Sequence, residues 1–108
     1  MIVQIVRFRS RMADEQVLET YRARAGRYLE QPGLAEKYYL QFRDTGEHGA
    51  VYVWESEEAM ERFRSSDLAR SIPEAYSVDG SPEVTIADVA MTLRSSLSGT
   101  YAAAEGAS

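Results

Sequence analysis

The chain has 108 residues, 44% of them hydrophobic, which is enough for one domain with its own core but not for two. Seventeen acidic residues outnumber twelve basic ones, and the formal net charge of −5 argues against a nucleic-acid partner, which requires a basic surface. Cysteine is absent, so disulfides, zinc–thiolate sites and a cysteine nucleophile are excluded. The sequence has no signal-peptide pattern and no apolar run of membrane-spanning length, so we expect a cytoplasmic protein that binds no membrane.

The first half of the chain predicts strand, helix and strand in that order. Residues 2–8, IVQIVRF, are mostly β-branched or aromatic, which is typical of a buried strand. Residues 13–31 have apolar side chains at helical spacing, and the PG pair at 32–33 ends this helix. Residues 34–43 alternate as a second strand. One face of that strand carries Leu34, Tyr38, Leu40 and Phe42.

A hairpin loop is predicted at 44–49, where DTGEHG has the Asp and Gly content of a turn. We expect His48 to be a solvated residue of this loop, with an acid–base role as the alternative. The remaining elements are a third strand, a helix, a short helical piece, a loop and a fourth strand. They span 50–55, 56–66, 67–72, 77–82 and 83–93, and the short helical piece ends at Pro73.

The predicted order β-α-β-β-α-β is that of the ferredoxin-like α+β fold, a four-stranded antiparallel sheet with its helices on one face and the strand order 4-1-3-2. Both faces of this sheet carry apolar residues, whereas a sheet with one wet face should alternate cleanly. We therefore expect a homodimer in which the uncovered face meets a second sheet. Its contacts would be made by Val3, Ile5, Val51 and Val53. The domain spans 1–94, and 95–108 form a tail or a partner-packing arm.

The segment YVWESEEAMERFRSS, after a strand that begins behind QPG, resembles the antibiotic-biosynthesis-monooxygenase superfamily, in particular its small members of the YdhR type. The resemblance covers about residues 1–94. It implies a dimeric α/β barrel whose pocket lies between each monomer's own sheet and helices. It also implies a small cofactor-independent monooxygenase acting on an aromatic or polyketide-like substrate. A non-catalytic ligand-binding dimer, or a cyclase or isomerase of the same fold, stays open as the alternative.

Two chemistries known in the superfamily can be compared with this sequence residue by residue. The quinone-forming enzymes use a Trp that matches Trp54, but their Asn and His positions fall at Ala50 and Leu40. The haem-degrading relatives use a helix Trp and an iron-ligating His, whose positions fall at Phe63 and about Pro73. The chain contains no asparagine, which the haem-degrading site also requires. The resemblance therefore favours the first chemistry, through Trp54.

A cofactor-free oxygenase needs an electron-rich phenolate or enolate that can give one electron to triplet oxygen, so we expect no metal or flavin, and molecular oxygen as co-substrate. The protein would supply an apolar cavity and a few polar groups that stabilise the anion. The resemblance places Trp54 in the wall of that cavity, and a core Trp is the alternative. The other expected pocket residues are Tyr38, Phe42, Tyr52, Met60 and Phe63.

Two polar strand residues complete the expected site. Asp88 lies on an apolar strand face, where it serves either as a base of raised pKa or as a charge that protects a sheet edge. Gln4 is the only polar residue of its strand before the arginines, and it would hold a substrate carbonyl or form a hydrogen bond at the dimer interface.

Overall fold

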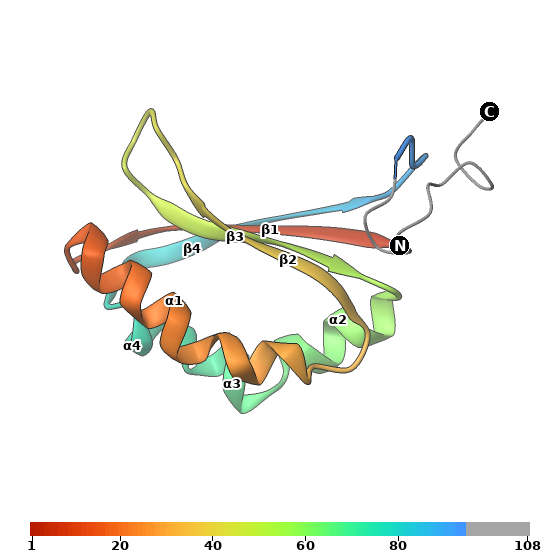
Figure 1. Cartoon of the computed structure of the whole chain (residues 1–108), viewed down its shortest axis with the longest axis horizontal. Helices are drawn as coiled ribbons and strands as arrows, with labels where there is room; N and C mark the ends of the chain where they lie inside the picture. The colour runs from red at the N-terminus through yellow and green to blue at the C-terminus, as the bar shows by residue number, and fades with distance from the viewer. Residues whose placement is uncertain (95–108) are drawn as a thin grey trace.

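The computed structural model describes residues 1–94, which form a four-stranded antiparallel sheet with every helix on one side (Figure 1). The elements in chain order are β1 (Ile2–Ser10), α1 (Asp14–Leu29), β2 (Leu34–Gln41), β3 (His48–Trp54), α2 (Glu57–Arg64), α3 (Asp67–Arg70), α4 (Ile72–Ala75) and β4 (Val78–Asp88). The strands lie in the order β2-β3-β1-β4. The ferredoxin-like α+β fold and the expected strand order are thus confirmed. The predicted tail at 95–108 lies outside the described residues.

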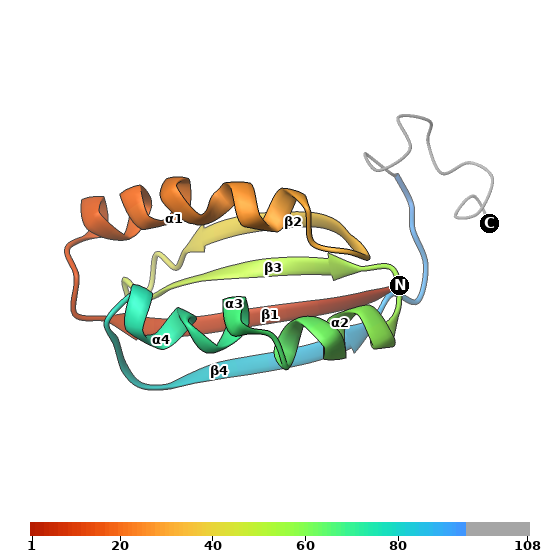
Figure 2. The same ribbon diagram turned by 90° about the horizontal axis from the view of Figure 1, so that it is seen from below.

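The helices form two rows on one face of the sheet, as Figure 2 shows. One row is α1, which lies along β2, and the other is α2, α3 and α4, which lie along β1 and β4. Serine caps begin α2 and α3, because the Oγ atoms of Ser56 and Ser66 accept hydrogen bonds from the backbone N–H groups of Ala59 and Ala69. No helix of the described residues is long and apolar enough to cross a membrane.

Several predicted boundaries are wrong, and the fourth strand ends at Asp88 rather than at 93. Residues 77–82 are not a loop, because β4 begins at Val78 and pairs with the end of β1. Its proline, Pro82, is tolerated because β4 is an edge strand. Pro73 does not end a helix but lies in the first turn of α4, where its missing N–H costs nothing. His48 is the first residue of β3 rather than part of the turn.

An irregularity in β2 decides which of its side chains face the helices. The pairing of β2 with β3 shifts between Leu34 and Glu36, so one extra residue enters β2. A bulge of this kind reverses the alternation that follows it. Leu34 packs on the helix side beside Trp54, but beyond the bulge Lys37 faces the helices and its neighbour Tyr38 does not.

Two buried clusters fill the space between the sheet and the helices. The first surrounds Trp54 and consists of Tyr28, Ala50, Tyr52, Trp54, Ala59, Met60 and Phe63. The second lies toward the other end of the sheet and consists of Phe8, Val17, Tyr21, Tyr76 and Val78. Both clusters are rich in aromatic side chains, which bury the most apolar surface per residue.

The opposite sheet surface, here called the open face, is covered by no helix of residues 1–94 (Figure 1). It carries Val3, Ile5, Val51 and Val53, which are only half-buried. Tyr38 lies on the same face and is 50% exposed. An apolar surface of this kind in a soluble domain is typical of a protein–protein contact.

Candidate functional site

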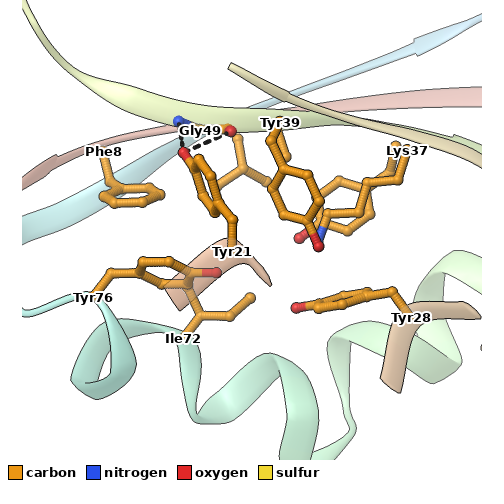
Figure 3. Close-up of a pocket in the computed structure, with 11 residues that line it drawn as sticks. Phe8, Tyr21, Tyr28, Lys37, Tyr39, Gly49, Ile72 and Tyr76 are labelled. Atoms are coloured by element: carbon orange, nitrogen blue, oxygen red, sulfur yellow. Dashed lines mark hydrogen bonds between the residues drawn. The ribbon is translucent and has the colours of Figure 1, made fainter. Parts of the chain in front are cut away.

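A small cavity lies between the two buried clusters and is lined mainly by tyrosines (Figure 3). It takes up about 20 Å³, which is room for about one water molecule. Strands and helices both contribute to its wall, and we call it the tyrosine cavity. Its polar side chains are those of Tyr21, Tyr28, Lys37, Tyr39, Tyr52 and Tyr76.

Lys37 is the most unusual of these residues, because it is the only lysine of the chain and its amine points at aromatic rings. Its Nζ lies 3.1 Å from the ring centroid of Tyr28, 4.4 Å from that of Tyr39 and 4.5 Å from that of Tyr52. Burial, together with the smaller effect of the positive charge of Arg24, lowers the pKa of Lys37 from 10.5 to about 6. Contact with ring faces favours the ammonium by roughly 0.5–2 kcal/mol, which offsets part of this effect without reversing it.

The tyrosine hydroxyls of the cavity are neutral hydrogen-bonding groups at ordinary pH. Burial raises the pKa values of Tyr21 and Tyr39 to about 12, and it also raises those of Tyr52 and Tyr76. The hydroxyl of Tyr21 lies 3.1 Å from the carbonyl oxygen of Leu40 and accepts a 3.2 Å hydrogen bond from the N–H of Gly49. The buried hydroxyl of Tyr39 has no hydrogen-bond partner, so it is available to a ligand oxygen.

Arg24 brings a buried positive charge to the same region. Its side chain joins α1 to the other row of helices, because Nη2 donates to the carbonyl oxygen of Leu68 over 3.1 Å and to Oγ of Ser71 over 3.0 Å. Its guanidinium carbon also lies 5.6 Å from the ring centroid of Tyr76. A fixed cation beside a closed apolar cavity favours an anion bound there.

Several surface grooves share lining residues with the tyrosine cavity and offer more room. The α1–β2 groove, of about 300 Å³, shares Tyr28, Lys37 and Tyr39 with the cavity. The β4 groove, of about 170 Å³, shares Val6, Tyr52 and Ile72 with it. The first reaches the size at which pockets begin to hold small organic molecules. Lys37 is therefore reachable from a groove large enough for an aromatic ring.

Trp54 and three of its expected neighbours do come together, but in a packed core. Trp54 is 0% exposed and its ring stacks on that of Tyr52, with centroids 5.8 Å apart. Its Nε1 donates to Oε1 of Gln4 over 2.9 Å, as a buried indole requires. Trp54 lines neither the tyrosine cavity nor the two grooves, whereas Tyr52 lines the cavity. Met60 and Phe63 are buried in the same cluster, and Phe63 also borders the β4 groove.

The expected position of Tyr38 and Phe42 beside Trp54 is wrong. The bulge in β2 turns Tyr38 onto the open face, opposite Val51. Phe42 lies beyond the end of β2, and its ring centroid is 4.0 Å from the guanidinium carbon of Arg7. Arg7 is on the same face of β1 as Val3 and Ile5, which is the open face. Neither residue lines the tyrosine cavity.

Gln4 does not take part in a sheet-to-sheet contact as expected, because it faces the helices and is held by Trp54. Asp88 is the last residue of β4, pairs with Ile2 and is exposed. Neither residue lines the tyrosine cavity. The position of Asp88 fits a charge at a sheet edge.

His48 is buried rather than solvated, being 5% exposed. Its Nε2 lies 3.2 Å from Oδ1 of Asp14, in an orientation that makes no hydrogen bond. It borders a further groove with Leu18, Tyr21 and Tyr39 at the start of α1.

Sequence reasoning missed Lys37, Arg24 and the tyrosines of α1, β2 and α4. The bulge hid Lys37, because an uninterrupted alternation from Leu34 places it on the wrong face. One signal was present nonetheless: eleven of the twelve basic residues are arginine, and the single lysine is at 37. Among residues 1–94, no group of three or more His, Asp or Glu side chains is placed to hold a metal ion, and the expected metal-free reaction stays a prediction.

Several solved structures share this fold at low sequence identity. The cofactor-independent oxygenase SnoaB from Streptomyces nogalater has a TM-score of 0.69 and 18% identity, and the match covers 85% of this chain and 95% of that one. Rv0793 from Mycobacterium tuberculosis has a TM-score of 0.66 and 18% identity, over 82% of this chain and 93% of its own. A structure of an antibiotic biosynthesis monooxygenase has a TM-score of 0.65 and 16% identity, over 82% and 98%. No protein-family model and no curated protein matches the sequence.

Proposed function

We propose that the chain is a small cofactor-independent monooxygenase that oxidises an aromatic or polyketide-like substrate with molecular oxygen. The observation that carries the proposal is the tyrosine cavity together with the adjoining α1–β2 groove: a mainly apolar site with one amine and several hydroxyls, on the helix side of the sheet. The similarity to SnoaB, named a cofactor-independent oxygenase, supports it. The YdhR type is the subgroup that we assign within the superfamily.

The groups around the cavity suit the formation of a substrate anion, which is the species that can pass an electron to triplet oxygen. The hydroxyl of Tyr39 is unpaired and can donate to a phenolate oxygen. Arg24 supplies a nearby buried positive charge. Donors and charges that are already in place cost no reorganisation when the anion forms. The apolar walls leave room for about one water molecule, and this limited solvation strengthens both interactions.

The working form in this proposal is a cytoplasmic homodimer whose open faces pack together as a barrel. The half-buried valines and isoleucine of that face support this assembly. Each subunit would keep its own tyrosine cavity, since the cavity lies on the helix side of its own sheet. Trp54 would not touch substrate but would orient Tyr52, on which its ring stacks. Any role of Asp88 would be exerted from the edge of the sheet.

Oxygen uptake with 1-naphthol and anthrone tests the proposal. Wild-type protein should consume oxygen with at least one of these substrates after treatment with a metal chelator, and a quinone should accumulate. The matched pair of variants is Tyr39→Phe, which removes the unpaired hydroxyl, and Tyr38→Phe, which removes a hydroxyl on the open face. Tyr39→Phe should slow uptake and Tyr38→Phe should not. Uptake that disappears with the chelator, or is absent with every aromatic substrate, rules the proposal out.

A second candidate is a cyclase or isomerase that uses the same cavity. The observation that favours it is the position of a titratable amine next to neutral phenols, which is an acid–base pair that needs no oxygen. Substrate conversion under anaerobic conditions, with no oxygen consumed, separates this candidate from the monooxygenase.

A further inference from the structure

The single lysine of the chain lies among aromatic rings, where a charged side chain is poorly solvated. Every other basic residue is arginine, which stays protonated at all accessible pH values, whereas lysine can lose its proton when buried. Lys37 is on β2 and is held between the sheet and α1, with ring faces on three sides. A residue type that can become a neutral amine is thus found once, and at the centre of the candidate site.

The surroundings of Lys37 lack the acceptors that an ammonium normally requires. Its Nζ faces the rings of Tyr28 and Tyr39 (Figure 3) and lies 4.5 Å from the ring centroid of Tyr52. None of the hydrogen bonds or ion pairs found in residues 1–94 involves it. Glu36, the adjacent residue, pairs opposite Val53 of the open face, and it also borders the α1–β2 groove. The charge that acts on the amine is that of Arg24, which is positive. Both features favour the neutral amine in the empty site, whose lone pair can accept a proton.

The amine is also placed where a substrate can reach it. Lys37 lines the tyrosine cavity and the α1–β2 groove together with Tyr28 and Tyr39. An aromatic ring in that groove lies beside the rings of these tyrosines, and a hydroxyl on it reaches toward Nζ. The other residues that line the groove are Ala25, Leu29, Leu34, Ala35 and Glu36, all apolar except the last.

From this placement we infer that Lys37 is the general base of the site and that the substrate enters as a neutral phenol or enol. The substrate O–H bond breaks, its proton bonds to the lone pair of Nζ, and the two electrons of the bond stay on the oxygen. The products are a phenolate or enolate and an ammonium, with no change of oxidation state. The ring faces, which attract a cation but not a neutral amine, then stabilise the ammonium. The anion is held between Lys37 and Arg24. This inference deepens the proposed function, on which it rests.

A phenol whose ionised form has its own absorption band reports the proton transfer without any turnover. The probe is 3-nitrophenol, a weaker acid than 4-nitrophenol, mixed with the protein at about pH 7, where an amine of pKa about 6 is mostly neutral and the free probe is mostly neutral too. Calorimetry in two buffers of different ionisation enthalpy counts the protons released on binding. Wild-type protein should produce the phenolate band with no net proton release, because the proton moves to Lys37 and stays there.

Two variants and a control make the result specific. Lys37→Met removes the amine but keeps an apolar chain, and it should lose the phenolate band. Lys37→Arg keeps a charge that cannot accept a proton, and it should show the band only with one proton released to buffer. Arg27→Met removes an exposed charge of α1 and should behave as wild type. Turnover of an oxidisable naphthol should fall about 100- to 10,000-fold in Lys37→Met.

Each other outcome overturns the inference. A band in wild type that appears with one proton released means that Lys37 was already an ammonium and acts by charge alone. No band in wild type, or an equal band in Lys37→Met, means that Lys37 takes no proton. Oxygen uptake separates this inference from the proposed function. A Lys37-dependent band without any uptake supports Lys37 as the base and rules out the monooxygenase. Uptake that is unchanged in Lys37→Met supports the monooxygenase and rules out Lys37 as its base.

Discussion

The Nε1 atom of Trp54 donates a hydrogen bond to Oε1 of Gln4 over 2.9 Å, between two side chains that are 0% and 3% exposed. Trp54 ends β3 and Gln4 lies in β1, so the bond joins the two central strands on their helix side. The polar end of the indole and the polar residue of β1 satisfy each other inside an otherwise apolar cluster. Replacing one partner alone therefore leaves the other buried without a hydrogen bond.

Trp54→Phe should lower the free energy of unfolding by about 1–3 kcal/mol, the cost of an unsatisfied buried polar group. The double variant Gln4→Met with Trp54→Phe should recover part of this loss, and Trp54→Ala should lose about 3–5 kcal/mol. Urea unfolding followed by circular dichroism measures all three, since the variants contain no tryptophan. A double variant that loses as much stability as Trp54→Phe and Gln4→Met lose separately, added together, would contradict the role assigned to this bond.

Lys37 should make the stability of the protein rise with pH. Its folded-state pKa is lowered from 10.5 to about 6, so between these values the unfolded chain binds a proton that the folded chain does not. The free energy of unfolding should increase from about pH 6 toward pH 10, by up to about 1.4 kcal/mol per pH unit. Thermal unfolding across this range, compared with Lys37→Met, isolates the effect. Parallel curves for the two proteins would show that the amine is charged in the folded state.

The buried tyrosines should produce the opposite trend in stronger alkali. The folded-state pKa values of Tyr21 and Tyr39 are raised from 10.0 to about 12, so above pH 10 the unfolded chain loses protons that the folded chain keeps. Their contribution to stability is complete below pH 10 and is lost as the pH rises through 12. Ultraviolet absorbance of tyrosinate at 295 nm should therefore rise together with unfolding. Tyr39→Phe should move the alkaline unfolding midpoint upward, whereas Tyr38→Phe, changed at an exposed residue, should move it less.

The open face should hold two subunits together. Val51 lies at its centre, between Ile5 of β1 and Tyr38 of β2. Wild-type protein should sediment as a dimer at micromolar concentration, because an interface of this kind hides roughly 1,200–2,000 Å². Val51→Arg should sediment as a folded monomer, while Leu29→Arg, at an 87% exposed residue of α1, should remain a dimer. A monodisperse wild-type monomer would refute the barrel assembly.

Removal of residues 95–108 should leave the fold intact. Both buried clusters are built from residues 8–78, so the described core needs nothing from this segment. The truncated chain should match the full chain in urea midpoint and in sedimentation. If the dimer dissociates on truncation, the segment is instead an arm that packs on the partner.

The sequence by itself determined the fold class, the strand order and the crowding of aromatic residues around Trp54. These conclusions depend on local pattern, since β-branched runs, helical spacing and the PG turn act over short segments, and few topologies connect such elements. The sequence also contains a single lysine, Lys37, which was not predicted as a site residue because nothing in the local pattern showed what surrounds it.

Only the tertiary structure decided which side chains meet. One extra residue in β2 moved Tyr38 to the open face and Lys37 into the tyrosine cavity, and no local preference of the segment LAEKYYLQ announces that bulge. The start of β3 at His48 and of β4 at Val78 was likewise decided by pairing with β1, which lies far away in the chain. Side-chain faces in a sheet depend on register, and register is set by partners that are distant in sequence. That is why the candidate site shifted from Trp54 to Lys37 and its tyrosines.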